Sequence, residues 1–198
     1  LWIRLNLFIP DARVGWNFTA LKAASRFIKK EKIDAIVSVG PPHSSHLIGL
    51  KLSRRFNIPH IPVLIDPWVD IVYYKNLKRS TITKMVDNHF EKSVLQNARQ
   101  VVFVNKSTEE DYEKKYSFLK GKSNVLYWGY DEEAFKDLKT DKIRKDEKII
   151  VHAGNMFAYQ NPKNFWKQIK IENDKGNKIV IRFVGSVDKE ILEYINSI

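Results

Sequence analysis

The segment from Asp34 to Asp70 constrains the fold more than any other part of the chain. It starts with a short β-branched run at 34–39 and ends with a second one at 61–65, and apolar residues between them recur at helical spacing. A strand, a helix and another strand in this order predict a parallel strand pair, because a parallel connection needs a long crossover. The segment therefore indicates an α/β fold in which helices flank a parallel sheet.

Polar residues follow both of these predicted strands. The loop 40–46 (GPPHSSH) follows the first strand, and Asp66-Pro67-Trp68 follows the second. In open parallel sheets, ligands bind outside the carboxyl ends of the strands, so both loops are expected at one ligand-binding edge. At that edge Asp66 would supply a carboxylate and Trp68 an aromatic plane for a ligand. The alternative interpretation is an Asx turn with a packed Trp.

The alternation of strands and helices continues on both sides of this segment. Helical spacing predicts a helix at 14–32 that packs on the sheet, and a second helix at 81–98. Ser107 and Glu110 have the spacing of a capping box, so another helix is expected to start there. Further strands are expected at 100–104, 125–128, 149–152 and 178–184. The expected buried stripes are Trp16, Ala20, Ala23, Ala24, Phe27 and Ile28 on the first helix, and Ile82, Met85, Val86, Phe90, Val94 and Leu95 on the second.

A charged stretch divides the chain near residue 140. From Asp137 to Lys148 the sequence loses almost all apolar residues, which is typical of a linker. A helix is expected at 162–171, because Asn161-Pro162 is a helix-start signal. The part after the linker is too short for a complete core, and the chain opens on an apolar run, so we expect further sequence on both sides. The predicted division is a first domain at 1–138, a linker at 139–147 and the start of a second domain at 148–198.

The chain of 198 residues carries a formal net charge of +11 and contains no cysteine. The lack of cysteine excludes disulfides and thiolate ligands and fits a reducing compartment. No apolar run approaches the roughly 20 residues that span a bilayer, so we expect a cytoplasmic protein. The positive charge indicates an anionic substrate, an anionic membrane surface or nucleic acid. It gathers on helix faces of the first domain, which favours lipid headgroups; lysine-rich solvated faces without a partner are the alternative.

A metal site is not expected. No pair among the five histidines has the spacing of a zinc motif. The acidic run Asp131-Glu132-Glu133 fits a helix or hinge start, where carboxylates suit the helix dipole.

Four blocks, in order, carry a resemblance to a known family. They are residues 40–49, the turn Asp66-Pro67-Trp68, the segment GYDEEAF at 129–135, and His152-Ala153-Gly154-Asn155. Pro10-Asp11 resembles the family's entry to this region. From about residue 10 to residue 185 the chain resembles the family 4 glycosyltransferases, and within them a branch that builds bacterial surface polysaccharides.

This resemblance implies the GT-B architecture of two facing Rossmann-like domains, and retaining transfer of a sugar from a nucleotide sugar. In such enzymes the first domain binds a glycan or lipid-linked acceptor, the second binds the nucleotide sugar, and transfer takes place in the cleft between them. No cofactor is implied, because the nucleotide sugar is a substrate. The implied partners are the nucleotide sugar and the acceptor, with a peripheral contact to the inner face of an anionic membrane and no nucleic acid.

The resemblance also assigns residues of the first domain. It implies that His46 lies near the reacting sugar, where a neutral imidazole hydrogen-bonds the donor or accepts a proton, and Asp66 is the second catalytic candidate. For either histidine the alternative is packing or capping on its own helix, for which Ser44 and Ser45 already offer oxygens. The expected substrate contacts are Gly40, His43, Ser44 and Trp68.

In the second domain, the implied site binds the donor diphosphate. Backbone N–H groups at the glycine turn and at the helix start would stabilise its charge. The family usually has basic residues after this glycine and at the helix start, whereas this chain has amides there and Lys163 as the nearest cation. The expected donor-phosphate residues are Gly154, Asn155, Gln160, Asn161 and Lys163.

Two other functions compete with glycosyl transfer. One is a non-catalytic basic module, a degenerate relative that binds nucleic acid or anionic membrane, which the charge and the missing phosphate cations favour. The other is a sugar-nucleotide epimerase of similar architecture, which the blocks at 41–49 and 129–135 disfavour. The family's N-terminal glycine-rich loop and its C-terminal motif with two Glu residues are not in these 198 residues, so we expect this polypeptide alone to be inactive.

Overall fold

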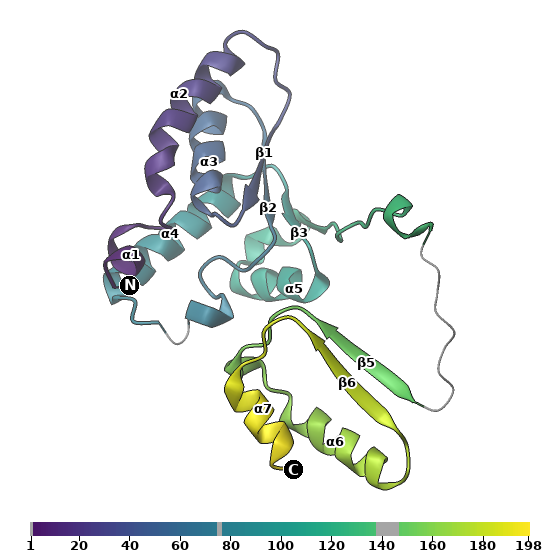
Figure 1. Ribbon diagram of the computed structural model, residues 1–198. Coiled ribbons are helices and arrows are strands. Elements are labelled where there is room, and N and C mark those ends of the chain that lie inside the picture. Colours follow the sequence, from purple (N-terminus) through teal and green to yellow (C-terminus); the bar gives the residue numbers. More distant parts are fainter. Residues whose placement is uncertain (1, 75–76, 138–146) are drawn as a thin grey trace. The chain divides into compact units, whose positions relative to one another are not determined.

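The computed structural model describes residues 2–74, 77–137 and 147–198, with Tyr73 described by its backbone alone. The chain divides into two compact units, Leu1–Tyr130 and Asp131–Ile198, called unit 1 and unit 2 below (Figure 1). Of the predicted linker at 139–147, all residues except Glu147 lie outside the described part of the chain.

Unit 1 contains a four-stranded parallel sheet in the order β1-β2-β3-β4. Its strands are β1 (Ile36–Gly40), β2 (His60–Leu64), β3 (Val101–Phe103) and β4 (Ser123–Val125). Gly40 pairs with Leu64, Leu64 with Phe103, and Phe103 with Val125, so the carboxyl ends of all four strands are in register. The α/β fold with a parallel sheet is therefore confirmed, and the loops after β1 and β2 emerge at the same edge.

Three helices connect these strands: α3 (Ser44–Phe56), α4 (Thr81–Asn97) and α5 (Lys106–Lys115). Each crossover moves the chain one strand along the sheet in the same direction, so right-handed crossovers place all three helices on one face. The core is built between this face and the helices. One cluster consists of Leu64, Leu95, Ala98, Val101, Phe103, Tyr112 and Leu119, and a second of Leu47, Leu50, Trp68 and Val94.

The N-terminal helices differ from the sequence expectation. Residues 2–7 form α1 (Trp2–Leu7), and the helix expected at 14–32 is a 3₁₀ turn (Val14–Trp16) followed by α2 (Asn17–Ile28). This helix packs on α3, and a cavity of about 590 Å³ separates its alanine face from β1. Trp16 and Phe27, expected in its buried stripe, are more than half exposed. Direct packing of this helix on the sheet was therefore a wrong expectation.

The first half of α4 buries polar residues instead of the expected apolar stripe. Ile82 and Met85 are 74% and 67% exposed, whereas Thr83, Asp87 and Glu91 are buried. These three residues are spaced four apart and share one helix face. Each has hydrogen-bond partners in other segments, which offset the cost of burial. Of the expected stripe, Phe90 is half-buried against a core cluster, and Val94 and Leu95 near the end of the helix are fully buried.

Two smaller boundaries also differ. Helix α5 begins at Lys106, because Asn105 is its N-cap and accepts a hydrogen bond from the N–H of Thr108 at 2.8 Å. The expected capping box at Ser107 is therefore wrong. Strand β4 ends at Val125, and residues 126–128, expected in that strand, are exposed.

Unit 2 consists of a parallel strand pair with two helices. Strand β5 (Lys148–Ala153) pairs in parallel with β6 (Ile179–Val184), and α6 (Lys163–Asp174) connects them. Helix α7 (Lys189–Asn196) follows β6. Short 3₁₀ turns span Val72–Tyr74 and Ser117–Leu119 in unit 1, and Glu133–Phe135 and Ala158–Gln160 in unit 2. No helix in the described residues has the length and apolarity that crossing a membrane requires.

Candidate functional site

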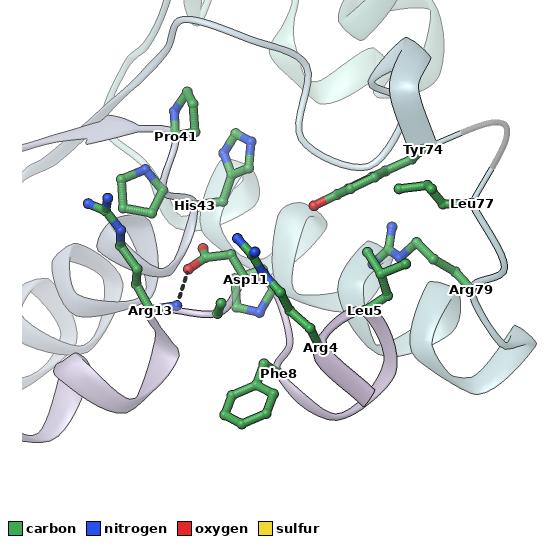
Figure 2. A pocket seen from close by; sticks show the side chains of 13 residues that line it. Arg4, Leu5, Phe8, Asp11, Arg13, Pro41, His43, Tyr74, Leu77 and Arg79 are labelled. Atoms are coloured by element: carbon green, nitrogen blue, oxygen red, sulfur yellow. Dashed lines mark hydrogen bonds between the residues drawn. The ribbon is translucent and has the colours of Figure 1, made fainter. Parts of the chain in front are cut away.

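Unit 1 contains a cavity of about 490 Å³ beside the loop that follows β1 (Figure 2). This volume is in the range of small-molecule sites. Three segments form the walls: the loop after β1, the segment after β2, and the N-terminal residues from α1 to the start of the 3₁₀ turn. The lining side chains with polar groups are Arg4, Asp11, Arg13, His43, Tyr74 and Arg79.

Asp11 attaches the N-terminal segment to this edge of the sheet. Its carboxylate accepts hydrogen bonds from the N–H of Ser44 at 2.7 Å, from the Ser44 hydroxyl at 3.0 Å and from the N–H of Arg13 at 2.9 Å. It therefore caps α3 from 33 positions upstream, where a carboxylate also suits the helix dipole. The Ser45 hydroxyl donates to backbone carbonyls instead. A cap from Ser44 or Ser45 was thus a wrong expectation, and both polar groups of Ser44 are used within the protein.

The cavity wall is electrically unbalanced. Arg79 is buried and paired with Asp87, and its guanidinium lies 4.5 Å from the centre of the Tyr74 ring. Arg4 and Arg13 have exposed side chains, and neither forms an ion pair within the described part of the chain. Asp11 is the one carboxylate among the described lining residues, and its oxygens are engaged at the start of α3. The two exposed guanidinium groups therefore outnumber the one carboxylate of the lining, and the cavity has a net positive charge.

His43 forms another part of the wall. Its ring stacks on Trp68 with centroids 5.0 Å apart and an interplanar angle of 6°. Gly40 lies against both nearby imidazoles, since a Cβ there would come within 2.4 Å of His46 Nε2 and 2.9 Å of His43 Nδ1. This glycine is thus required by close packing. Trp68 is only 1% exposed, so its ring is packed in the core, as in the alternative interpretation of this turn.

Behind His43, a buried polar chain continues into the core. Ser38 Oγ lies 2.7 Å from His46 Nδ1 and 2.7 Å from His60 Nε2. Its single proton bonds one ring, so the other ring must donate to it. His46 is fully buried, and its Nε2 has no hydrogen-bond partner in the described residues. The expected catalytic His46 therefore does not reach the cavity directly.

Burial keeps these histidines neutral. It lowers the pKa of His43 from 6.5 to about 4, with Asp11 opposing the shift, and lowers the pKa of His60 to about 4. The pKa of His46 is lowered well below 6.5, first by burial and then by the neighbouring His43 and His60. At neutral pH the cavity therefore presents an uncharged imidazole at His43, which is able to donate or accept one hydrogen bond.

Buried carboxylates of α4 fix the loop after β2. Asp87 accepts from Trp68 Nε1 at 2.7 Å and pairs with Arg79. Burial raises the pKa of Asp87, and the bonds from Arg79 and Trp68 oppose that shift. Glu91 accepts from the Tyr112 and Tyr116 hydroxyls at 2.8 Å each, from Lys115 at 2.6 Å and from the N–H of Val69 at 3.1 Å.

Asp66, the second expected catalytic residue, lies at the carboxyl end of β2, as the sequence predicted. Its side chain is half-buried, and the described residues donate no hydrogen bond to its carboxylate. It is not among the residues that line the cavity. The structure thus places Asp66 at the expected edge without bringing it into the same pocket as His43.

In unit 2, the expected phosphate-binding residues follow β5 and precede α6. Gly154 has a φ of +132°, which favours glycine, and its N–H bonds to Val184. Three amide oxygens accept internal hydrogen bonds: Asn155 from the N–H of Ser186, Gln160 from the N–H of Phe157, and Asn161 from Trp166 Nε1. Their NH₂ groups have no partner in the described residues. Lys163 begins α6 and lies 5.3 Å from the centre of the Tyr194 ring.

Comparison with known proteins shows the family. The model of Glycosyltransferase Family 4 matches residues 2–134, which include the sheet of unit 1 and every segment that lines the cavity. The chain belongs to glycosyltransferase family 4. This family 4 chain is also similar to a solved structure described as "S. aureus MnaA-UDP co-structure", at 13% identity and a TM-score of 0.43. That similarity covers 95% of this chain and 51% of the other, so the chain spans about half of that protein's length. No curated protein matches the chain.

Sequence reasoning missed most of the charged wall of this family 4 domain. Arg4, Arg13 and Arg79 are isolated in the sequence and belong to no motif. The one available signal was Pro10-Asp11, which matched the family's entry to this region. Asp11 lies 33 positions before Ser44 in the sequence, and only the structure shows the bond between them.

Proposed function

We propose that this family 4 chain serves retaining transfer of a sugar from a nucleotide sugar to a glycan or lipid-linked acceptor in surface polysaccharide synthesis. Unit 1 would bind the acceptor, and unit 2 would bind the nucleotide sugar. The observation that carries this proposal is the cavity of about 490 Å³ at the strand ends of unit 1, within the segment that matches the family. Ligands of parallel sheets bind at this edge.

In unit 1, we assign separate roles to the two histidines. The neutral His43 at the cavity wall would hydrogen-bond acceptor hydroxyls. His46 would act as a positioning residue, because its buried ring lies against Gly40 and is tilted against Trp68, 5.6 Å between centroids. Asp66 remains the candidate general base, since its half-buried carboxylate is not engaged by the described residues.

In unit 2, the amides would hold the donor diphosphate. The amide oxygens of Asn155, Gln160 and Asn161 each accept a hydrogen bond from within unit 2. Their NH₂ groups are therefore the donors that remain for a ligand. Amide N–H groups, the first turn of α6 and the Lys163 ammonium are suitable partners for a diphosphate. This donor set carries one cation where relatives have more, so we expect nucleotide binding that depends on Lys163.

Thermal unfolding with nucleotides tests the donor part. We expect one of UDP, GDP or TDP to raise the Tm, and Lys163→Ala to reduce that shift. Lys167→Ala is the matched control, because it removes an exposed lysine from the same helix. The nucleotide that binds then identifies the nucleotide part of the donor.

The competing function is a non-catalytic basic module. It would be favoured if no nucleotide changed the Tm while duplex DNA bound tightly with a steep salt dependence. A related proposal is peripheral contact with an anionic membrane through α1, where Trp2, Ile3 and Leu7 are exposed beside Arg4. Flotation with phosphatidylglycerol vesicles, and its loss in a Trp2→Ser, Leu7→Ser variant, checks that contact.

A further inference from the structure

The cavity of unit 1 has the chemistry of an anion site. Its wall contains three arginines and one carboxylate among the described lining residues. Asp87 balances Arg79 from behind the wall, and the oxygens of Asp11 are engaged at the start of α3. The charges of Arg4 and Arg13 together exceed the single negative charge of Asp11, so the cavity has a net positive charge, and it is large enough for a small ligand.

The two arginines lie on segments that are held by hydrogen bonds. Asn6, two residues after Arg4 on α1, accepts from the N–H of Ser80 at 2.6 Å and from the Thr83 hydroxyl at 3.0 Å, and donates to the carbonyl of Lys78 at 3.1 Å. These bonds join α1 to the start of α4. The backbone of Arg13 is held by Asp11, 2.9 Å from its N–H. A ligand in the cavity would therefore meet two arginines whose backbones are held in place and whose side chains are exposed.

The neutral lining adds selectivity for an anion that carries an organic group. Figure 2 shows the Tyr74 hydroxyl and the Arg4 guanidinium directed towards the interior of the cavity, with His43 above them. Leu5, Phe8 and Leu77 supply apolar surface nearby. A free inorganic ion would leave this apolar surface without a contact, whereas an ester would cover it.

We propose that the acceptor of this chain carries a phosphate ester, and that Arg4 and Arg13 bind this phosphate in the unit 1 cavity. The identification of this ligand as the acceptor rests on the proposed function, whereas the anion site itself does not. Arginine binds phosphate oxygens through charge-assisted and often bidentate hydrogen bonds. The phosphate would come from a lipid-linked acceptor or from a soluble phosphorylated glycan, which share this chemistry.

Direct binding tests the site without any transfer assay. The purified protein is titrated with a short-chain isoprenyl phosphate, with a sugar 1-phosphate and with inorganic phosphate, by calorimetry at low and high salt. We expect both esters to bind more tightly than inorganic phosphate and to weaken at high salt, because the arginines are exposed. A preference for the isoprenyl ester indicates a lipid source, and a preference for the sugar ester a soluble one.

Charge variants locate the site. Arg4→Gln and Arg13→Gln are each expected to weaken the preferred ester roughly tenfold, whereas Arg13→Lys retains part of the affinity. The control Arg99→Gln removes an exposed arginine of unit 1 outside the cavity and should bind as the parent does. Circular dichroism checks that each variant is folded. Equal binding by the glutamine variants and the parent, or no ester binding at all, would overturn the proposal.

The outcome is separable from that of the proposed function. If the ester binds and the arginine variants weaken it while no nucleotide raises the Tm, the anion site is supported and the transferase proposal fails. If a nucleotide raises the Tm and both arginine variants bind the ester as the parent does, the transferase proposal is supported and this inference fails.

Discussion

The strand ends of the two units use polar side chains in different ways. In unit 1, the loops after β1 and β2 are held by groups from distant segments: Asp11 caps α3, and Asp87 and Glu91 of α4 bind the loop that contains Trp68. In unit 2, the amides after β5 bond mainly within their own turns, and Asn155 reaches only the neighbouring loop at Ser186. Unit 1 therefore depends on buried polar contacts between distant segments, whereas the polar contacts of unit 2 are more exposed and, apart from the Asn155–Ser186 bond, local.

The largest difference between the two units should appear on acidification, which is expected to destabilise unit 1. The folded state holds His43 and His60 at pKa values of about 4, below the unfolded value of 6.5, so the unfolded state binds more protons between these values. The free energy of unfolding of unit 1 should therefore fall as the pH drops from 6.5 towards 4, by about 1.4 kcal/mol per pH unit for each neutral histidine. Amide exchange in β1 to β4 and in β5 to β6, measured at several pH values, checks this.

Two variants control the acid experiment. His60→Gln removes one titrating group and should make the pH dependence of unit 1 shallower. His89→Gln, which changes an exposed histidine on α4 away from the buried histidines, is the matched control for the substitution itself. A pH-independent stability of unit 1 between 6.5 and 4.5 would contradict the assignment of neutral, buried histidines.

The second-largest difference between the units should be the loss of stability when a carboxylate is removed. Glu91→Ala leaves the hydroxyls of Tyr112 and Tyr116 without their common acceptor and leaves the Lys115 ammonium with Asp70 alone, so we expect a loss of about 3–5 kcal/mol. Glu172→Ala in unit 2 breaks bonds to Lys175 and Asn177 in a more exposed place, and should cost much less stability than Glu91→Ala.

Urea denaturation measures the free energy of unfolding of both variants. Glu110→Ala, which changes an exposed residue of α5, is the matched control in unit 1. Similar losses for Glu91→Ala and Glu172→Ala would show that the buried network of unit 1 is not the stronger of the two.

The smallest effect should come from the loop of unit 2. Asn155→Ala removes one exposed hydrogen bond, 3.1 Å long, to the N–H of Ser186, and should reduce stability by about 0.5–1.5 kcal/mol. Asn155→Asp preserves the accepting oxygen and should restore stability, while it removes the NH₂ group that we assign to the diphosphate. We expect both variants to lose nucleotide binding and only Asn155→Ala to lose stability. This result would separate the structural role of the side-chain oxygen from the binding role of the NH₂ group.

The sequence predicted the fold better than the site. Both parallel units followed from apolar runs separated by helical spacing, and their observed ends lie within a few residues of the expected ones. The failures have one physical cause. On α4, Ile82 and Met85 resemble a buried stripe, but the buried face carries Thr83, Asp87 and Glu91. Periodicity records which residues are apolar, and it does not record whether a polar side chain finds partners elsewhere.

By itself, the sequence determined the order of strands and helices, the parallel pairing and the glycine turn at Gly154, because these depend on local spacing and backbone conformation. Only the tertiary structure decided that Asp11 caps α3, that His46 is enclosed behind Gly40, and that Arg4 and Arg13 face one cavity. These contacts join residues that are far apart along the chain. Their free energy comes from groups brought together by folding, which no local pattern encodes.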